Sequence, residues 1–148
     1  MFTLITAAAS SKAYQLTNKL LSKENIIFAD SEDLPEIMLR GKRFIKILKG
    51  NSASFAHLLL SICLDQQITK VFPLRKAEVY ALSEARQLFD EYNICVMVPE
   101  LSKLDKFMGN DLKGELIISE DLINFDGELL RGAFVKNNAG VYQLFTAD

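Results

Sequence analysis

Runs of apolar residues alternate with amphipathic stretches over the first two thirds of the chain. The apolar runs have few polar interruptions, as parallel strands covered on both faces do, and they occupy residues 2–7, 25–29, 44–48, 69–74 and 94–98. Between them, apolar side chains recur every three or four positions, which predicts helices over residues 12–22, 52–66 and 76–92. This alternation predicts an α/β fold: a three-layer, Rossmann-like parallel sheet of about five strands with helices on both faces.

The pattern changes after a short helix expected over residues 100–110. From Gly114 the apolar runs become short and strand-like, at residues 116–118, 122–125, 129–135 and 141–145. The pair Asp126-Gly127 between two of these runs is a strong signal for a two-residue hairpin turn. We therefore expect a small antiparallel β meander over residues 111–148, following a Rossmann-like domain over residues 1–110.

The helix predicted over residues 52–66 has a core-facing stripe at helical spacing, formed by Phe55, Leu58, Leu59, Ile62 and Cys63. His57 lies off this stripe, so we expect it to be a surface histidine rather than a metal ligand. The strand over residues 44–48 lies within a basic patch that follows an acidic one, and edge strands commonly carry lysine. A solvated sheet edge and a phosphate-attracting patch are both open readings of these charges.

The stretch Thr3–Asp30, TLITAAASSKAYQLTNKLLSKENIIFAD, is predicted to form the first strand–helix–strand unit. In open α/β sheets, ligands bind near the loop that follows the first strand. That loop, Ala7–Ser11, contains no glycine, whereas dinucleotide-binding loops need glycines so that the backbone can approach a pyrophosphate. A dehydrogenase is therefore disfavoured, although Asp30 occupies the position of a ribose-binding acid. Ser10 and Ser11 could bind an anion or cap the helix.

Composition and charge limit the functional classes. The chain has 148 residues, 49% of them hydrophobic, and a formal net charge of −2, which argues against a nucleic-acid-binding surface. Its apolar runs are too short to span a membrane and no secretory signal is recognised at Met1, so we expect a soluble, cytoplasmic protein. Cys63 and Cys95 lie inside apolar runs and are expected to be reduced, buried thiols. We assign no catalytic and no metal-binding residue.

Residues 2–108 resemble a known family. The segments that carry the resemblance are LITAAAS, IIFAD, GKRFIKI, VFPLRKAEVYALSEARQLFDEYNICVMVPE and LDKFMGN, in that order. They are similar to the N-terminal, Rossmann-like "pre-ATP-grasp" domain of ATP-grasp carboxylate–amine ligases, in particular those like the carbamoyl-phosphate synthase large subunit. A complete ligase needs a further ATP-binding region about the size of another domain. Residues 115–136 are faintly similar to a strand–turn–strand of that region, which suggests a remnant.

The resemblance implies a stand-alone, degenerate pre-ATP-grasp domain without ligase activity of its own, which binds a small ligand or a partner protein. We place the ligand at the carboxyl ends of the strands, beside Ala8, Ser10, Ser11, Asp30 and Arg75. The serines would bind an anion, Asp30 a hydroxyl or amine, and Arg75 a carboxylate or phosphate, so the ligand would be anionic or amino-acid-like. Helix caps, a strand-end turn and a solvated charge are the ordinary structural alternatives for these residues.

Three other functions remain open. The chain could be a subunit of a split ligase, with ATP and Mg²⁺ bound only when an ATP-grasp partner chain supplies the missing region. It could be a nucleotide-binding regulatory or oxidoreductase domain, which would bind ATP or NAD by itself. It could also form a homodimer through the third strand or residues 114–148. For the degenerate domain itself no cofactor is expected, with ATP and Mg²⁺ only if a partner chain supplies the missing ATP-grasp region.

Overall fold

Five parallel strands form the centre of the protein in a computed structural model, which describes residues 1–20, 25–109, 112–125 and 127–148. The strands are β1 (Phe2–Ile5), β2 (Ile26–Asp30), β3 (Arg43–Lys46), β4 (Ile68–Phe72) and β5 (Cys95–Val96). Their order in the sheet is β3-β2-β1-β4-β5, and each neighbouring pair is parallel. This confirms the predicted α/β fold. The strand order reverses direction between β1 and β4, which makes that position the topological switch point of the sheet.

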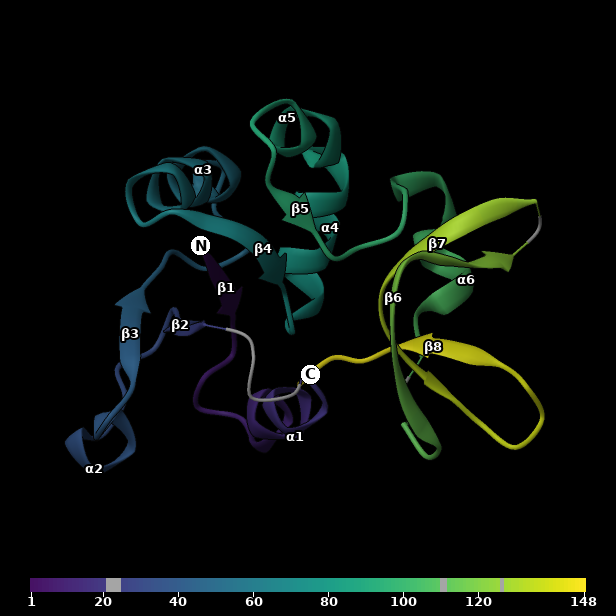
Figure 1. Cartoon of the computed structure of the whole chain (residues 1–148), viewed down its shortest axis with the longest axis horizontal. Coiled ribbons are helices and arrows are strands. Elements are labelled where there is room, and N and C mark those ends of the chain that lie inside the picture. Colours follow the sequence, from purple (N-terminus) through teal and green to yellow (C-terminus); the bar gives the residue numbers. More distant parts are fainter. Residues whose placement is uncertain (21–24, 110–111, 126) are drawn as a thin grey trace.

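Helices cover both faces of this sheet (Figure 1). The helices are α1 (Ser11–Lys19), α2 (Glu36–Leu39), α3 (Phe55–Asp65), α4 (Lys76–Glu84), α5 (Arg86–Glu91) and α6 (Leu104–Phe107), with a 3₁₀ turn η1 (Leu101–Lys103) before α6. Figure 1 shows α1 on one side of the sheet and α3, α4 and α5 on the other. The predicted end of the first helix, up to residue 22, lies outside the described residues.

Two details of the helix predictions were wrong. The helix expected over residues 76–92 is divided into α4 and α5, because Ala85 has φ −92° and ψ 7° and leaves the helical conformation. In α3, Leu60 is buried and Leu58 is 47% exposed, whereas the stripe predicted the reverse. The Leu58 side chain faces the gap between α3 and the edge strand β3, where the sheet ends and no further element covers the helix within the described part of the chain.

A second sheet of three antiparallel strands follows, as the change of pattern after Gly114 predicted. Its strands are β6 (Glu115–Phe125), β7 (Glu128–Lys136) and β8 (Tyr142–Leu144), in the order β6-β7-β8. Two predicted runs are joined in β6, whose register shifts between Glu120 and Ile123, and Asp121 takes a φ of 62° there. The strand therefore continues through the polar interruption with an irregular register, as strands do at a β-bulge. Of the predicted turn, Gly127 has the expected positive φ of 81°, while Asp126 lies outside the described residues.

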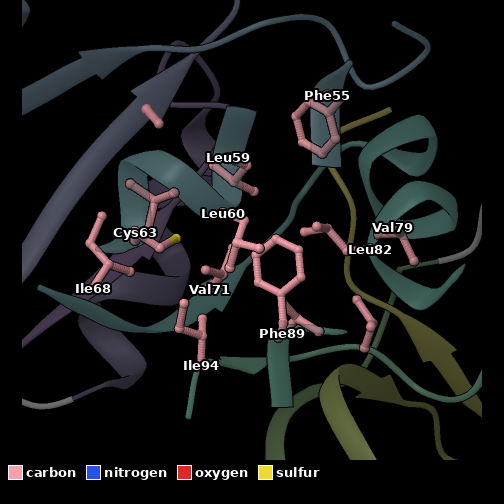
Figure 2. Packing of buried hydrophobic residues seen from close by; sticks show 14 of the residues in the cluster. Phe55, Leu59, Leu60, Cys63, Ile68, Val71, Val79, Leu82, Phe89 and Ile94 are labelled. Carbon is pink, nitrogen blue, oxygen red and sulfur yellow. The ribbon is translucent and has the colours of Figure 1, made fainter. Parts of the chain in front are cut away.

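Two hydrophobic clusters fill the space around the sheet. The larger one, shown in Figure 2, packs α3, α4 and α5 against the sheet through side chains such as Phe55, Leu59, Leu82 and Phe89. The smaller one joins α1 to residues of β7 and to Phe145. The second sheet therefore packs on the first and shares its core. In the described residues, no helix has the length and apolar character needed to cross a membrane.

The edge position predicted for the third strand is confirmed, since β3 is the outermost strand. Its basic side chains are bound to neighbours within the chain. Lys46 pairs with Asp33 at 2.8 Å, Arg43 Nη2 donates to the Gln66 side chain at 2.7 Å, and Lys42, just before the strand, donates to the Tyr14 hydroxyl at 2.9 Å. These contacts support the reading of the charges as a solvated sheet edge.

Candidate functional site

Asp30 and Arg75 meet at the carboxyl edge of the parallel sheet. Asp30 is the last residue of β2 and is fully buried, while Arg75 directly precedes α4 and follows the end of β4. The Arg75 Nη2 atom donates to Asp30 Oδ1 at 3.0 Å and to Oδ2 at 3.2 Å. Since β1 lies between β2 and β4 in the sheet, this ion pair crosses the carboxyl end of β1.

Backbone donors complete the surroundings of the Asp30 carboxylate. The amide of Ala9 donates to Oδ2 at 3.0 Å, and the amide of Glu32 lies 3.4 Å from Oδ1. Burying a carboxylate is costly unless it is paired and hydrogen-bonded, and here both kinds of partner are present. Asp30 thus ties the loop after β1, the loop after β2 and the start of α4 together.

The loop after β1 is closed by contacts within the chain. Ala7 takes a positive φ of 53°, and its carbonyl oxygen accepts a hydrogen bond from the Ser10 amide at 2.8 Å. The Ser10 side chain caps α1 by accepting from the Lys12 amide at 3.1 Å, and Ser11 is the first residue of the helix. Ala8 is buried, with 1% of its surface exposed, and its amide donates to Ala29. Ser10 therefore acts as a helix cap, one of the two roles expected for it.

A second buried acid, Glu78, lies in the first turn of α4. The Leu74 amide donates to Thr6 Oγ1 at 2.8 Å, and Thr6 Oγ1 donates to Glu78 Oε1 at 2.5 Å. Burial raises the pKa of Glu78 to about 7, although the hydrogen bond from Thr6 and the positive charge of Arg75 oppose this shift. Glu78 Oε2 is buried and has no hydrogen-bond partner among the described residues. Thr6 therefore links the end of β1 to the residues after β4 and, through Glu78, to α4 at the switch point.

A cavity of about 210 Å³ opens beside Arg75, at the carboxyl ends of β2, β3 and β4. Its lining consists of Ser31, Glu32, Lys49, Gly50, Asn51, Arg75, Ala77 and Asp148. Two cationic and two acidic side chains converge there, and Arg75 Nε is buried without a hydrogen-bond partner in the described part of the chain. Drug-sized ligands occupy sites of about 300–1,000 Å³. This cavity is therefore suited to a small molecule that carries both charges.

A larger groove of about 710 Å³ adjoins this cavity and runs between α3 and α4. Its lining is dominated by small side chains, including Ala53, Ala56, Ala77, Ala81 and Ala85. The Tyr80 hydroxyl at this groove donates to Asp105 at 3.0 Å. The groove lacks the converging cations of the smaller cavity, so we take the smaller cavity as the candidate site.

Comparison with protein-family models and with curated protein sequences finds no match for this chain. The arrangement of the residues themselves therefore carries the functional argument.

Residues that could bind a metal ion or act as nucleophiles do not form a common site in the described part of the chain. Over the described ranges, no group of three or more His, Cys, Asp or Glu side chains is arranged to hold a metal ion. His57 is exposed on α3, as predicted, and Cys63 is buried. Cys95 is half-buried rather than buried, and the pKa of its thiol is raised by burial. The cysteines thus lie away from the cavity beside Arg75.

The structure brings together some of the residues that the sequence suggested. Asp30 and Arg75 are in direct contact, but Arg75 alone of the five candidates lines the cavity. Lys49, Gly50 and Asn51 line it and were missed as site residues, although they follow the carboxyl end of the third predicted strand. The rule that ligands bind at the carboxyl edge applies to that loop as well. Asp148 could not be placed from local pattern, since it reaches the cavity only through the packing of the second sheet.

Proposed function

We propose that the protein is a non-catalytic, small-ligand-binding domain, a degenerate form of the pre-ATP-grasp domain that its sequence resembles. The ligand is amino-acid-like and binds in the cavity beside Arg75. The observation that carries this proposal is the convergence of Lys49 and Arg75 with Glu32 at the carboxyl edge of a Rossmann-like sheet. Open α/β sheets bind ligands at this edge.

The charges of the cavity match the two charged groups of an amino acid. Arg75 keeps one side of its guanidinium on Asp30 and is 27% exposed, so it is held in place and still borders the cavity. Together with the exposed Lys49 it would attract the α-carboxylate, because guanidinium and ammonium groups form strong charge-assisted hydrogen bonds with carboxylates. Glu32, on the loop after β2, would attract the α-ammonium group.

The same contacts argue against a nucleotide. In a dinucleotide-binding sheet the pyrophosphate lies against the loop after β1, at the start of the following helix. Here the Asp30–Arg75 pair crosses the end of β1, Ala8 is buried, and the Ser10 hydroxyl accepts from the Lys12 amide. A nucleotide would have to displace these contacts, and the cavity of about 210 Å³ is too small to hold it otherwise.

A thermal-shift screen of the whole chain with L-amino acids, inorganic phosphate, ATP, ADP and NAD tests the proposal. A ligand that binds the native state raises the melting temperature by mass action. We expect a shift with one or more amino acids and none with the nucleotides at millimolar concentration. A shift with NAD or ATP alone would contradict the proposal and favour a nucleotide-binding domain.

Two lysine variants locate the binding site. Lys49→Ala removes a cation from the cavity and should weaken amino-acid binding about fivefold to tenfold in a calorimetric titration, by loss of a charge-assisted contact. Lys46→Ala is the matched control, since Lys46 is also exposed on this edge of the sheet but pairs with Asp33 outside the cavity. Equal affinities for the two variants would place the ligand elsewhere.

A further inference from the structure

The segment Phe145–Asp148 lies across the loops that follow β1 and β4. The Ala147 amide donates to the Leu74 carbonyl oxygen at 2.6 Å, directly after β4. Asp148 Oδ1 accepts a hydrogen bond from the Lys76 amide at 2.8 Å, at the start of α4. Figure 1 shows the end of the chain beside α1, having crossed from the second sheet. The segment therefore runs along the switch point, where open α/β sheets bind their ligands.

The first two residues of this segment, Phe145 and Thr146, are buried in the protein. Phe145 is 4% exposed and belongs to the same hydrophobic cluster as Ala7 and Ala8 of the loop after β1. The Lys12 ammonium group of α1 lies 5.3 Å from the centre of the Phe145 ring. Thr146 is also buried, and its hydroxyl donates to the Asp148 carbonyl oxygen at 3.1 Å. Asp148, by contrast, is exposed and lines the candidate cavity.

The Asp148 carboxylate is bound at the border of the candidate cavity. Asp148 lines the cavity together with Arg75 and Lys49, and its carboxylate accepts from the Lys76 amide at the start of α4. The chain thus supplies a carboxylate of its own to this cavity. A tethered group competes at a high effective concentration, so a free ligand has to displace it.

We propose that Asp148 is an internal competitor for the cavity, and that a carboxylate-bearing ligand binds by displacing the end of the segment Phe145–Asp148. This inference rests on the proposed function, because it concerns the regulation of the same site. Phe145 and Thr146 stay anchored in the core, while Ala147 and Asp148 detach from Leu74 and Lys76. Only molecules in which Asp148 has detached from Lys76 can bind the ligand. The apparent association constant is therefore the intrinsic constant multiplied by the fraction of detached molecules.

Two variants release the segment in different ways. Asp148→Ala removes the competing carboxylate, and Ala147→Pro removes the amide that donates to Leu74 while leaving every charge in place. Each should bind L-aspartate about tenfold more tightly than the unmodified chain in a calorimetric titration. Asp33→Ala is the matched control for charge, because it removes an exposed acid of the loop after β2 that does not line the cavity.

A second measurement follows the displacement directly. In amide NMR spectra of the unmodified chain, saturating L-aspartate should shift the Ala147 and Lys76 resonances and shorten the exchange lifetime of the Ala147 amide. If L-aspartate binds the unmodified chain and both released variants with equal affinity, Asp148 does not compete with the ligand. That result would overturn this inference and leave the proposed function standing. An equal gain for Asp33→Ala and Asp148→Ala, with no gain for Ala147→Pro, would overturn it as well. Absence of binding in all variants would overturn both.

Discussion

Arg75 and Asp30 connect the ends of two strands that are not neighbours in the sheet. Their ion pair spans from β4 to β2 over the end of β1, and the Ala9 amide from the intervening loop donates to the same carboxylate. The loop after β1 is therefore held by contacts within the chain. The buried Ala7 and Ala8 of this loop and the ion pair therefore belong to one arrangement of contacts within the chain.

Breaking this pair should destabilise the protein strongly. Arg75→Met removes the partner of a fully buried carboxylate, and Asp30→Asn removes the counterion of Arg75. Buried pairs cost about 3–5 kcal/mol when one partner is lost, and the partial exposure of Arg75 reduces this to about 2–4 kcal/mol. Urea denaturation at pH 7 should show this loss of unfolding free energy in each single variant. The double variant should lose less than the sum of the two singles, by at least about 1 kcal/mol.

The exposed pair formed by Asp33 and Lys46 provides the comparison. Its side chains are 85% and 57% exposed, so the coupling in the equivalent cycle, Asp33→Asn with Lys46→Met, should be below about 1 kcal/mol. Additive losses of unfolding free energy for the Asp30 and Arg75 variants would show that the two side chains act independently. The ion pair would then not be what holds the loop after β1.

Local signals in the sequence were enough for the strand–helix order and for some of the site. The ends of β2 and β4 were predicted next to Asp30 and Arg75, and the carboxyl edge of a parallel sheet brings such residues together. The cap of α1 was also predictable, since a serine two residues before a helical amide accepts its hydrogen bond readily. The strand ends and the cap depend on local spacing, and the contact between Asp30 and Arg75 follows from the parallel sheet that these strands form.

Features that depend on long-range packing were missed. Leu58 and Leu60 differ in burial because α3 lies next to the sheet edge, which helical spacing alone does not reveal. The positive φ of Ala7 was not expected either, because that conformation costs a non-glycine residue about 1–2 kcal/mol and is permitted only by its surroundings. Asp148 reaches Lys76 across 72 residues of sequence, and no local pattern encodes that contact.

Gly50 allows the loop after β3 to approach α4 closely. A β-carbon at this position would lie 2.5 Å from the Glu78 amide nitrogen and 2.8 Å from the Ala77 carbonyl carbon. Gly50→Ala should therefore destabilise the protein by about 1–3 kcal/mol and weaken ligand binding, since the loop that carries Lys49 has to move. Urea denaturation and a calorimetric titration check the two effects.

Gly109→Ala is the control for this substitution. A β-carbon there would meet atoms of the Gln143 side chain at 2.7 Å, and a side chain can rotate away where backbone cannot. Its cost should be smaller than that of Gly50→Ala, with unchanged ligand affinity. The reverse ranking would contradict the close approach of the loop to α4.

The two cysteines should differ in their reactivity toward a disulfide reagent. Cys63 is 1% exposed and burial raises the pKa of its thiol to about 12, so at pH 8 about one molecule in ten thousand carries the thiolate. In the Cys95→Ser variant we expect no labelling of the native protein within hours and full labelling of Cys63 in urea. The Cys63→Ser variant reports on Cys95, which is half-buried and should react in the native state at a measurable rate. Rapid native labelling of Cys63 would show that the core around α3 opens.

The buried Glu78 should make stability fall as the pH rises. The folded-state pKa is about 7 and the ordinary value is 4.5, so between these pH values the folded state retains a proton that the unfolded state has lost. Stability therefore decreases from pH 4.5 to pH 7, by about 3 kcal/mol from this group alone.

The Glu78→Gln variant keeps an acceptor for Thr6 and cannot titrate, so the difference in unfolding free energy between it and the unmodified chain isolates this effect. Urea denaturation in steps of half a pH unit measures the difference, and Glu91→Gln at the end of α5 serves as an exposed control. Parallel curves for the unmodified chain and Glu78→Gln would show that Glu78 ionises normally, and that burial does not raise its pKa in the folded state.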